Sequence, residues 1–282
     1  PGDHILVPSP SYPLFDFLAD CNDVSLIRYP LLYDKGWTID FDGLKNLIQP
    51  HMRVLMVVNP NNPTGSYLDI QSMRELIDLA QKHRLCLICD EVFFDYAYTD
   101  TSKKIQSFAA YSDVPLCVLN GLSKMLALPQ LKASWMLIQG PDAFCDQAIE
   151  RMEIISDTFL SVNTPVQVGM AGLLALRENI QKQILERLMC NRQFLTRQIQ
   201  DFPACSYLHA EGGWYAMIRM PALMSDEDWA MVLLEQHGVY VHPGHYYHIH
   251  EGACLVLSLL TETHLFKEGV EIILDALQRR CH

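Results

Sequence analysis

Short apolar runs rich in valine, isoleucine and leucine recur along the first half of the chain. Their length and composition are typical of strands that are buried on both faces. These predicted strands are His4–Val7, Val24–Tyr29, Arg53–Asn59, Leu85–Asp90, Leu116–Leu119 and Trp135–Gln139.

Longer segments with a helical pattern separate several of these runs. A stripe of apolar residues with a 3.6-residue period predicts a helix over Asp69–Arg84. Asp40 is placed to cap a second helix, Phe41–Ile48. Strands that alternate with helices in this way predict an α/β fold, with a mainly parallel sheet covered by helices on both faces.

The pattern changes after about Pro141, where long helices replace the alternation. Helical patterns cover Asp142–Thr158 and Val166–Gln200. Shorter strands and a last helix follow: Trp214–Arg219, Val239–His242, Ala253–Leu259 and His264–Arg280. We therefore predict a large domain over residues 1–150, and connecting helices with a small α+β domain over residues 151–282.

Composition excludes some classes of partner. The 282 residues carry a formal net charge of -12, which argues against a nucleic-acid surface. No apolar run approaches the length of a bilayer span and no signal peptide is visible, so we expect no membrane partner. The nine cysteines are odd in number and lie in apolar segments, which favours reduced thiols in a cytoplasmic protein.

Three polar clusters directly follow predicted strands. The loop Asn59–Gly65 leaves the third strand, Asp90 ends the fourth and Lys124 follows the fifth. An amide, a carboxylate and an amine at neighbouring strand ends have the chemistry to hold an aldehyde cofactor with a basic ring nitrogen, such as pyridoxal 5'-phosphate (PLP). Singly, each has a structural interpretation: a turn, a helix cap or ion pair, and a solvated lysine.

Further motifs extend this pattern over nearly the whole chain. In order they are Pro10-Ser11-Tyr12-Pro13, Asn59-Pro60-Asn61-Asn62-Pro63-Thr64-Gly65, Asp90-Glu91-Val92-Phe93, Ser123-Lys124, Asn163-Thr164-Pro165, Gly212-Gly213-Trp214-Tyr215 and Pro243-Gly244. Their order and spacing resemble the class I/II aminotransferases, which are PLP enzymes of fold type I. Alanine- and aspartate-type aminotransferases are the nearest relatives within that resemblance.

The resemblance implies a role for each residue around the cofactor ring. Lys124 would form the Schiff base with PLP and later move the substrate's Cα proton. Asp90 would keep the ring nitrogen protonated, Asn62 would donate to the phenolic oxygen and Tyr12 would stack on the ring. Ser123 and Lys132 would help to neutralise the phosphate.

The sequence departs from the family's pattern at several positions. Lys132 replaces a phosphate-binding arginine and so lacks its bidentate fork. Phe93 replaces a tyrosine that donates to the phenolic oxygen, which predicts a raised pKa for the lysine–cofactor linkage. Cys254 lies at or near the place of the arginine that binds the substrate carboxylate, and Arg219 is a candidate substitute.

The sequence also starts after the family's opening segment, which carries a phosphate-binding turn at a helix N-terminus. We expect weaker cofactor binding without it. The histidines in His242-Pro243-Gly244-His245-Tyr246-Tyr247-His248-Ile249-His250 suggest a metal site, but no cysteine or carboxylate completes a ligand set, and we expect no metal.

The leading hypothesis is a PLP-dependent transaminase (EC 2.6.1.-) of amino acid metabolism, acting on an amino acid and a 2-oxo acid. The resemblance further implies a homodimer. A competing enzymatic hypothesis is a lyase or decarboxylase on the same fold. Two non-enzymatic hypotheses are an aminotransferase-like sensor domain and an inactive fragment.

Overall fold

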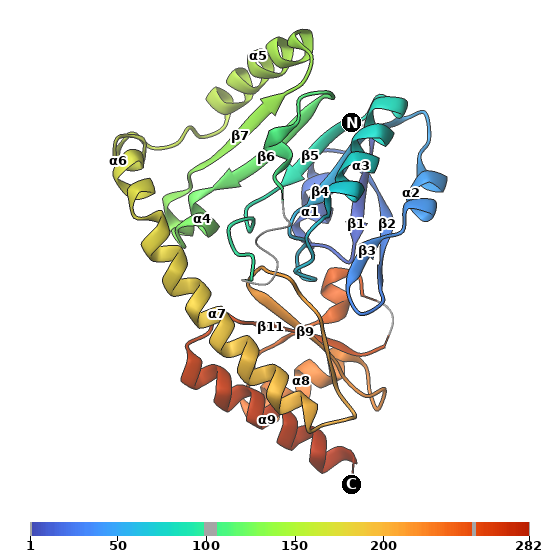
Figure 1. Ribbon diagram of the computed structural model, residues 1–282, viewed down its shortest axis with the longest axis vertical. Coiled ribbons are helices and arrows are strands. Elements are labelled where there is room, and N and C mark those ends of the chain that lie inside the picture. Colours follow the sequence, from blue (N-terminus) through green and yellow to red (C-terminus); the bar gives the residue numbers. More distant parts are fainter. Residues whose placement is uncertain (1, 99–105, 250–251, 282) are drawn as a thin grey trace.

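Residues 2–98, 106–249 and 252–281 are described in the computed structural model, which contains two sheets (Figure 1). The larger sheet has seven strands in the order β3-β2-β1-β4-β5-β6-β7. In chain order these strands are β1 (His4–Ser9), β2 (Ser25–Tyr33), β3 (Trp37–Ile39), β4 (Met52–Val58), β5 (Cys86–Asp90), β6 (Leu116–Gly121) and β7 (Ser134–Gln139). The five central strands run parallel, and β3 and β7 are antiparallel edges.

Helices α2 (Phe41–Leu47) and α3 (Ile70–His83) contribute to the apolar core of this sheet. Both begin at an aspartate that caps the helix, because Asp40 accepts from Gly43 N and Asp69 accepts from Ser72 N. On the opposite face α1 (Leu14–Cys21) lies near β2, but Val54, Met56 and Ile88 stay partly exposed. We predicted helices on both faces of this sheet, but among the described residues helices cover only one face fully.

Three long helices follow: α5 (Asp142–Thr158), α6 (Thr164–Ala175) and α7 (Arg177–Gln200). The prediction of one helix over Val166–Gln200 was wrong, because the chain leaves the helical path at Leu176. There the Leu176 N–H turns back to the Leu173 carbonyl, and Arg177 binds Asp95 at 2.8 Å.

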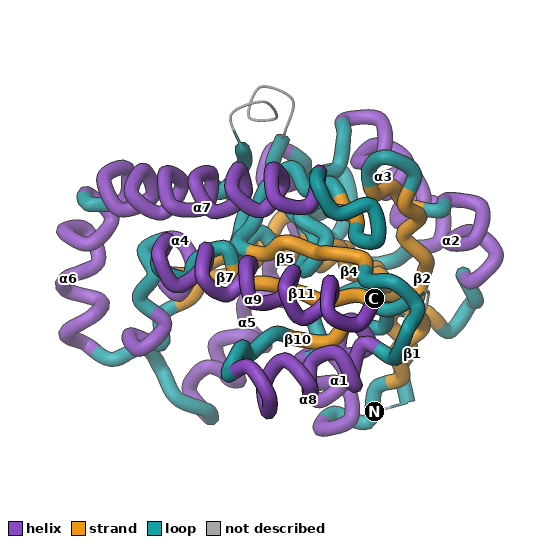
Figure 2. The backbone as a smooth tube through the Cα atoms, turned by 90° about the horizontal axis from the view of Figure 1, so that it is seen from below, coloured by secondary structure: helices purple, strands orange, loops and turns teal. Residues whose placement is uncertain are grey.

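The smaller sheet is antiparallel, with the order β10-β11-β9-β8. Its strands are β8 (Ser206–Leu208), β9 (Tyr215–Arg219), β10 (His242–Pro243) and β11 (Cys254–Ser258). Helices α7, α8 (Asp226–His237) and α9 (Thr263–Cys281) flank it, and α9 lies between the other two (Figure 2). The predicted strand Val239–His242 was wrong for all but its last residue, which pairs with Val256.

Four short helices complete the described elements. They are η1 (Phe108–Ala110), α4 (Leu122–Met125), η2 (Pro129–Leu131) and η3 (Gly244–Tyr247). The apolar core of the smaller sheet also takes in Phe93, Tyr96 and Tyr98, which lie just after β5. The segment after β5 therefore joins the larger sheet to the smaller one. No helix among the described residues has the length and apolar character needed to cross a membrane.

Candidate active site

The carboxyl ends of β4, β5 and β6 meet at one edge of the larger sheet. Val58 pairs with Asp90, and Asp90 pairs with Leu119. Beyond the strand ends, Asn59 N donates to the Asp90 carbonyl at 2.9 Å, and Glu91 N donates to the Leu119 carbonyl at 3.0 Å. The structure therefore places the three predicted polar clusters on adjacent strands.

Lys124 lies in the single turn of α4, directly after β6. Its half-buried amine is 5.6 Å from the centre of the Phe93 ring and 5.5 Å from that of Trp214. Burial lowers the pKa of Lys124, and the charge of Asp90 opposes this shift. Among the described residues the amine forms no hydrogen bond or ion pair, so it is available as a nucleophile.

Asp90 faces the opposite electrostatic situation. Burial raises the pKa of its carboxyl, while a hydrogen bond from Val92 N at 3.0 Å and the charge of Lys124 act to lower it. A carboxylate in such a position is stabilised by any cationic group that comes close.

The asparagine loop after β4 uses its amides differently. Asn59 accepts from Leu68 N at 3.1 Å, and Asn61 donates to the Pro10 carbonyl at 3.1 Å and to the Thr64 hydroxyl at 2.9 Å. These two amides hold the loop together. The buried Asn62 forms no side-chain hydrogen bond with the described residues, and its Oδ1 is unpaired. Its amide is thus free for a ligand.

Two glycines bring this loop against the turn before β9. Gly65 has φ +67°, and a Cβ there would lie 2.4 Å from the Gly212 carbonyl oxygen. The Gly65 carbonyl accepts from Glu211 N and Gly212 N, both at 2.9 Å. This contact fixes the segment that carries Trp214 and Tyr215 beside the strand ends of the larger sheet.

Tyr12 approaches the same region from the loop after β1. Burial raises the pKa of Tyr215, and the nearby Tyr12 raises it further. The Tyr215 ring lies 6.1 Å from the Phe93 ring, which in turn lies below the Lys124 amine. Ser11 N donates to the Tyr247 carbonyl at 3.1 Å. The geometry therefore gives an aromatic wall that leads from Lys124 toward Tyr12.

The profile of the family described as Aminotransferase class I and II matches residues 1–272. The chain belongs to this family.

Similar proteins carry related names. An alanine aminotransferase from Mycobacterium tuberculosis is 30% identical over 229 residues, which make up 80% of this chain and 53% of that protein. A glutamate-pyruvate aminotransferase from Escherichia coli is 28% identical over 224 residues, 78% of this chain and 55% of that protein. The chain thus spans about half the length of the curated relatives that it matches.

Solved structures share the fold. A tyrosine aminotransferase from Leishmania infantum superimposes with a TM-score of 0.90 at 23% identity, covering 99% of this chain and 69% of that one. An alanine aminotransferase from Pyrococcus furiosus gives a TM-score of 0.87 at 24% identity, covering 99% and 71%. The two-sheet architecture is therefore that of the aminotransferases of fold type I.

Three other predicted site residues make no side-chain hydrogen bond or ring contact with the Lys124 amine among the described residues. Ser123 precedes it in α4 and is partly buried. Lys132 is exposed at the end of η2, with φ 51°. Arg219 is exposed at the far end of β9, four residues or roughly 13 Å from Tyr215 at the usual strand rise. It faces Cys254 of β11 in the register.

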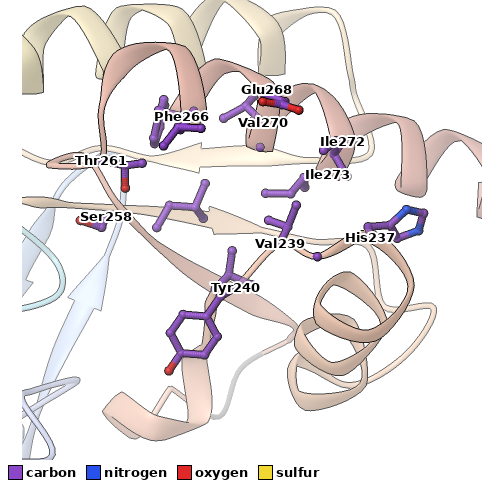
Figure 3. A pocket seen from close by; sticks show the side chains of 15 residues that line it. His237, Val239, Tyr240, Ser258, Thr261, Phe266, Glu268, Val270, Ile272 and Ile273 are labelled. Carbon is purple, nitrogen blue, oxygen red and sulfur yellow. The ribbon is translucent and has the colours of Figure 1, made fainter.

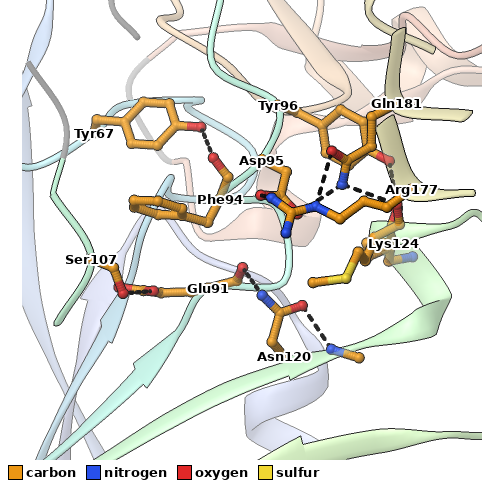
Figure 4. A network of polar contacts seen from close by, with 12 residues as sticks. Tyr67, Glu91, Phe94, Asp95, Tyr96, Ser107, Asn120, Lys124, Arg177 and Gln181 are labelled. Carbon is orange, nitrogen blue, oxygen red and sulfur yellow. Dashed lines mark hydrogen bonds and ion pairs between the residues drawn. The ribbon is translucent and has the colours of Figure 1, made fainter. Parts of the chain in front are cut away.

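The sequence shows no sign of a polar network beside Lys124 and α4 (Figure 4). Tyr96 and Gln181 donate to the main chain of α4, and Asp95 and Arg177 bind Gln181. Gln181 lies 57 residues after Lys124 on α7, and no local motif marks it.

The histidines near η3 contact separate partners. His242 contacts the Tyr247 hydroxyl at 2.8 Å, His245 contacts Asp226 at 3.2 Å and His248 contacts Asp16 at 2.8 Å. His250 lies outside the described residues. Among those described, no three metal-ligating side chains come together.

A cavity of about 370 Å³ opens in the smaller-sheet part of the molecule (Figure 3). Val239, Phe266 and Ile273 line its apolar side, and Ser258 and Glu268 add polar groups. It includes none of the predicted site residues, so it is separate from the site around Lys124.

Proposed function

We propose that the protein acts as a PLP-dependent aminotransferase (EC 2.6.1.-) that moves an amino group between an amino acid and a 2-oxo acid. The observation that carries this proposal is the amine of Lys124. The amine is half-buried, has a lowered pKa and forms no hydrogen bond among the described residues. Lys124 follows β6, which pairs with the strand that ends at Asp90. Burial favours the neutral amine, which is the form that reacts with an aldehyde.

The residues present fit PLP. Lys124 would bond to its aldehyde, Asp90 would face its ring nitrogen and the unpaired amide of Asn62 would face its phenolic oxygen. When bound, PLP supplies an electron-withdrawing ring that stabilises negative charge at the substrate Cα. Lys124 can then hold and return a proton, because its amine has a lowered pKa.

Peripheral residues would complete the cofactor site. We propose that the Tyr12 ring covers one face of the cofactor, and that Ser123 and Lys132 serve its phosphate. The exposed side chains of Tyr12 and Lys132 are free to turn toward such a ligand.

The substrate carboxylate needs a cation, and β11 contains none from Cys254 to Ser258. Arg219 is our proposed substitute, because it lies opposite Cys254 on the adjacent strand. The same absence favours a PLP-dependent lyase or decarboxylase as the second candidate function, since a different carboxylate contact permits different bond cleavage. L-Alanine with 2-oxoglutarate is the first pair to test, because the similar proteins are named for alanine, glutamate and pyruvate.

We further propose a homodimer in the cytoplasm. Helix α5 buries none of its 17 residues, although Ile149, Ile154 and Ile155 are among them. An amphipathic helix of that length normally packs an apolar stripe against a partner. The eight cysteines whose side chains the structure describes form no disulfide with one another, which is typical of a reducing compartment.

The test is an absorbance spectrum with added PLP. We expect a band near the visible region that Lys124→Ala abolishes and that the matched variant Lys82→Ala retains. An amino acid alone should convert the cofactor stoichiometrically to its amine form. Release of carbon dioxide or ammonia with no such conversion would support a lyase or decarboxylase, and no Lys124-dependent band would reject both functions.

A further inference from the structure

Helix α4 is too short to hold Lys124 by itself. It has four residues, whereas isolated helices need about 12–15 residues to be even marginally stable in water. A helix also leaves its last carbonyl groups without partners inside the helix. From the described main chain, the Lys124 carbonyl accepts one weak hydrogen bond, from Ala127 N at 3.4 Å.

Two buried side chains supply the missing donors. The Tyr96 hydroxyl donates to the Lys124 carbonyl at 2.6 Å and approaches the Met125 carbonyl at 3.4 Å. The Gln181 amide donates to the Met125 carbonyl at 3.2 Å. The shortest of these contacts is thus made to the residue that carries the reactive amine.

The donors are themselves held in place (Figure 4). Asp95 Oδ2 accepts from Gln181 at 2.8 Å, and Asp95 Oδ1 accepts from Arg177 Nη2 at 2.8 Å. Arg177 Nε donates to Gln181 Oε1 at 3.3 Å. Gln181 therefore has partners for its oxygen and its nitrogen, and its orientation is fixed.

These contacts join α4 to the smaller sheet. Arg177 and Gln181 lie in the first turns of α7, and Ile184, Leu188 and Leu195 of the same helix belong to the apolar core around the smaller sheet. A shift of that core relative to the larger sheet would move Gln181, which is hydrogen-bonded to the Met125 carbonyl.

We propose that Tyr96 and Gln181 are positioning residues for the Lys124 amine, and that α7 transmits movements of the smaller sheet to it. The amine has no hydrogen bond of its own among the described residues, so its place depends on its main chain. Reactive groups need placement within about 0.5 Å, and a 1 Å error costs roughly 100-fold in rate. The inference rests on the proposed function only in requiring that Lys124 reacts with a carbonyl compound.

The experiment measures the amine directly, without a loaded enzyme. Pyridoxal, which lacks the phosphate, is incubated with the protein from pH 6 to 10 and trapped with borohydride. Peptide mass spectrometry then compares labelling of Lys124 with that of the exposed Lys82 in the same sample. In the wild type we expect Lys124 to be labelled faster than Lys82 and at lower pH.

The variants are Tyr96→Phe, Gln181→Met and Arg177→Gln. Tyr96→Phe and Gln181→Met should slow Lys124 labelling about tenfold and move its pH midpoint toward that of Lys82. Arg177→Gln, which alters only a partly exposed side chain, should have a smaller effect in the same direction. The matched controls are Tyr111→Phe, whose hydroxyl contacts Gln106, and Gln183→Met, whose amide contacts only Asn179 of its own helix.

Two results overturn the inference in different ways. If all three variants label Lys124 at the wild-type rate and pH, Tyr96 and Gln181 have only a structural role. If wild-type Lys124 is labelled no faster than Lys82, the proposed function fails and this inference fails with it. In active preparations, we also expect the three variants to lower kcat and to leave KM for the amino acid nearly unchanged.

Discussion

At the residue scale, the site is built from two ionisable groups that burial shifts toward their neutral forms. The pKa of Lys124 is lowered and that of Asp90 is raised, and each charge partly counteracts the shift of the other. Asp90 gains a single main-chain hydrogen bond, from Val92. Burial of these two charged groups therefore lowers the stability of the fold, which is common for reactive groups at active sites.

Asp90→Asn should therefore stabilise the protein without cofactor. The pKa of Asp90 is raised above 3.8 in the folded state, so between these two pKa values the folded state binds more protons than the unfolded state. Asp90 therefore makes stability fall as pH rises from about 3.8 through its raised pKa. Asparagine keeps the acceptor for Val92 and removes the charge. We expect a gain of about 1 kcal/mol at pH 7 and none at pH 3.5.

Urea unfolding at both pH values, on wild type and variant, measures this difference. The same variant should lose most of its Lys124-dependent absorbance with PLP. A loss of stability in the variant at pH 7 would contradict the conclusion that the buried charge of Asp90 destabilises the fold. Glu91, whose pKa is also raised by burial, should leave some pH dependence in the variant.

Phe93→Tyr tests the predicted effect of the missing hydroxyl. The buried Phe93 ring packs edge-on against Trp214 and Tyr215 beside the Lys124 amine. A hydroxyl there should stabilise the phenolate of the cofactor and lower the pKa of the Lys124–cofactor linkage by about one unit. Absorbance titration of the holoenzyme gives that pKa, and Phe94→Tyr, one residue away, is the control. An unchanged pKa in Phe93→Tyr would reject the idea.

Single residues were predictable where a motif and a strand end coincide. Asn62 and Lys124 follow short apolar runs and Asp90 ends one, so their place at one sheet edge follows from the local pattern. Their roles stay predictions until they are tested. Tyr96 and Gln181 carry no such signal, because they meet α4 only through the tertiary fold.

At the scale of elements, the sequence predicted the longer ones, such as α3 and α5, whether or not they bury an apolar stripe. Helix α5 has the predicted bounds, and α3 differs by one residue at each end. Helix α1 was missed because it has eight residues and no capping side chain, and β3 and β8 because they have three residues each. Helix α8 was missed despite its Ser225 cap, because its apolar residues form no clear stripe.

A contact between α1 and the loop after η3 gives an element-scale prediction. His248 has φ 61°, which is unfavourable for a side chain, and its ring lies 2.8 Å from Asp16, which also binds Arg28. Burial raises the pKa of Asp16, but the hydrogen bonds from His248 and Arg28 outweigh it, so the pKa is lowered overall. The contacts of Asp16 with Arg28 and His248 therefore stabilise the fold above the ordinary carboxyl pKa, and acid weakens them.

We expect Asp16→Asn to destabilise the protein by up to about 1 kcal/mol at pH 7, since the pair is partly exposed. His248→Gly should be nearly neutral, because relief of the left-handed backbone offsets the lost hydrogen bond to Asp16. Hydrogen exchange at residues 247–249 should nevertheless rise in both variants. Unchanged exchange in both would show that the contact does not hold the two elements together; Asp20→Asn on the same helix is the control.

At the scale of the molecule, the two sheets were predictable and their junction was not. Alternating apolar runs predicted the parallel sheet, and the change of pattern after Pro141 predicted a second unit. The core of the smaller sheet nonetheless takes in Phe93, Tyr96 and Tyr98, so the first half of the chain contributes to both cores. Tertiary packing determines which core these residues join, and the hydrophobic period of the sequence does not predict it.

The proposed homodimer gives a test at the same scale. Leu160 is 96% exposed, Val168 80% and Phe159 76%, and all three lie at or near the connection of α5 to α6. Apolar side chains grouped in this way usually mark an interface. We expect light scattering after gel filtration to give twice the 32.2 kDa chain mass, and the double variant Leu160→Asp with Val168→Asp to give a monomer. Leu223→Asp, at a half-exposed leucine near α8, should remain dimeric. A monomeric wild type at micromolar concentration, or a dimer that survives both aspartates, would mean that this face does not pair two copies of the chain.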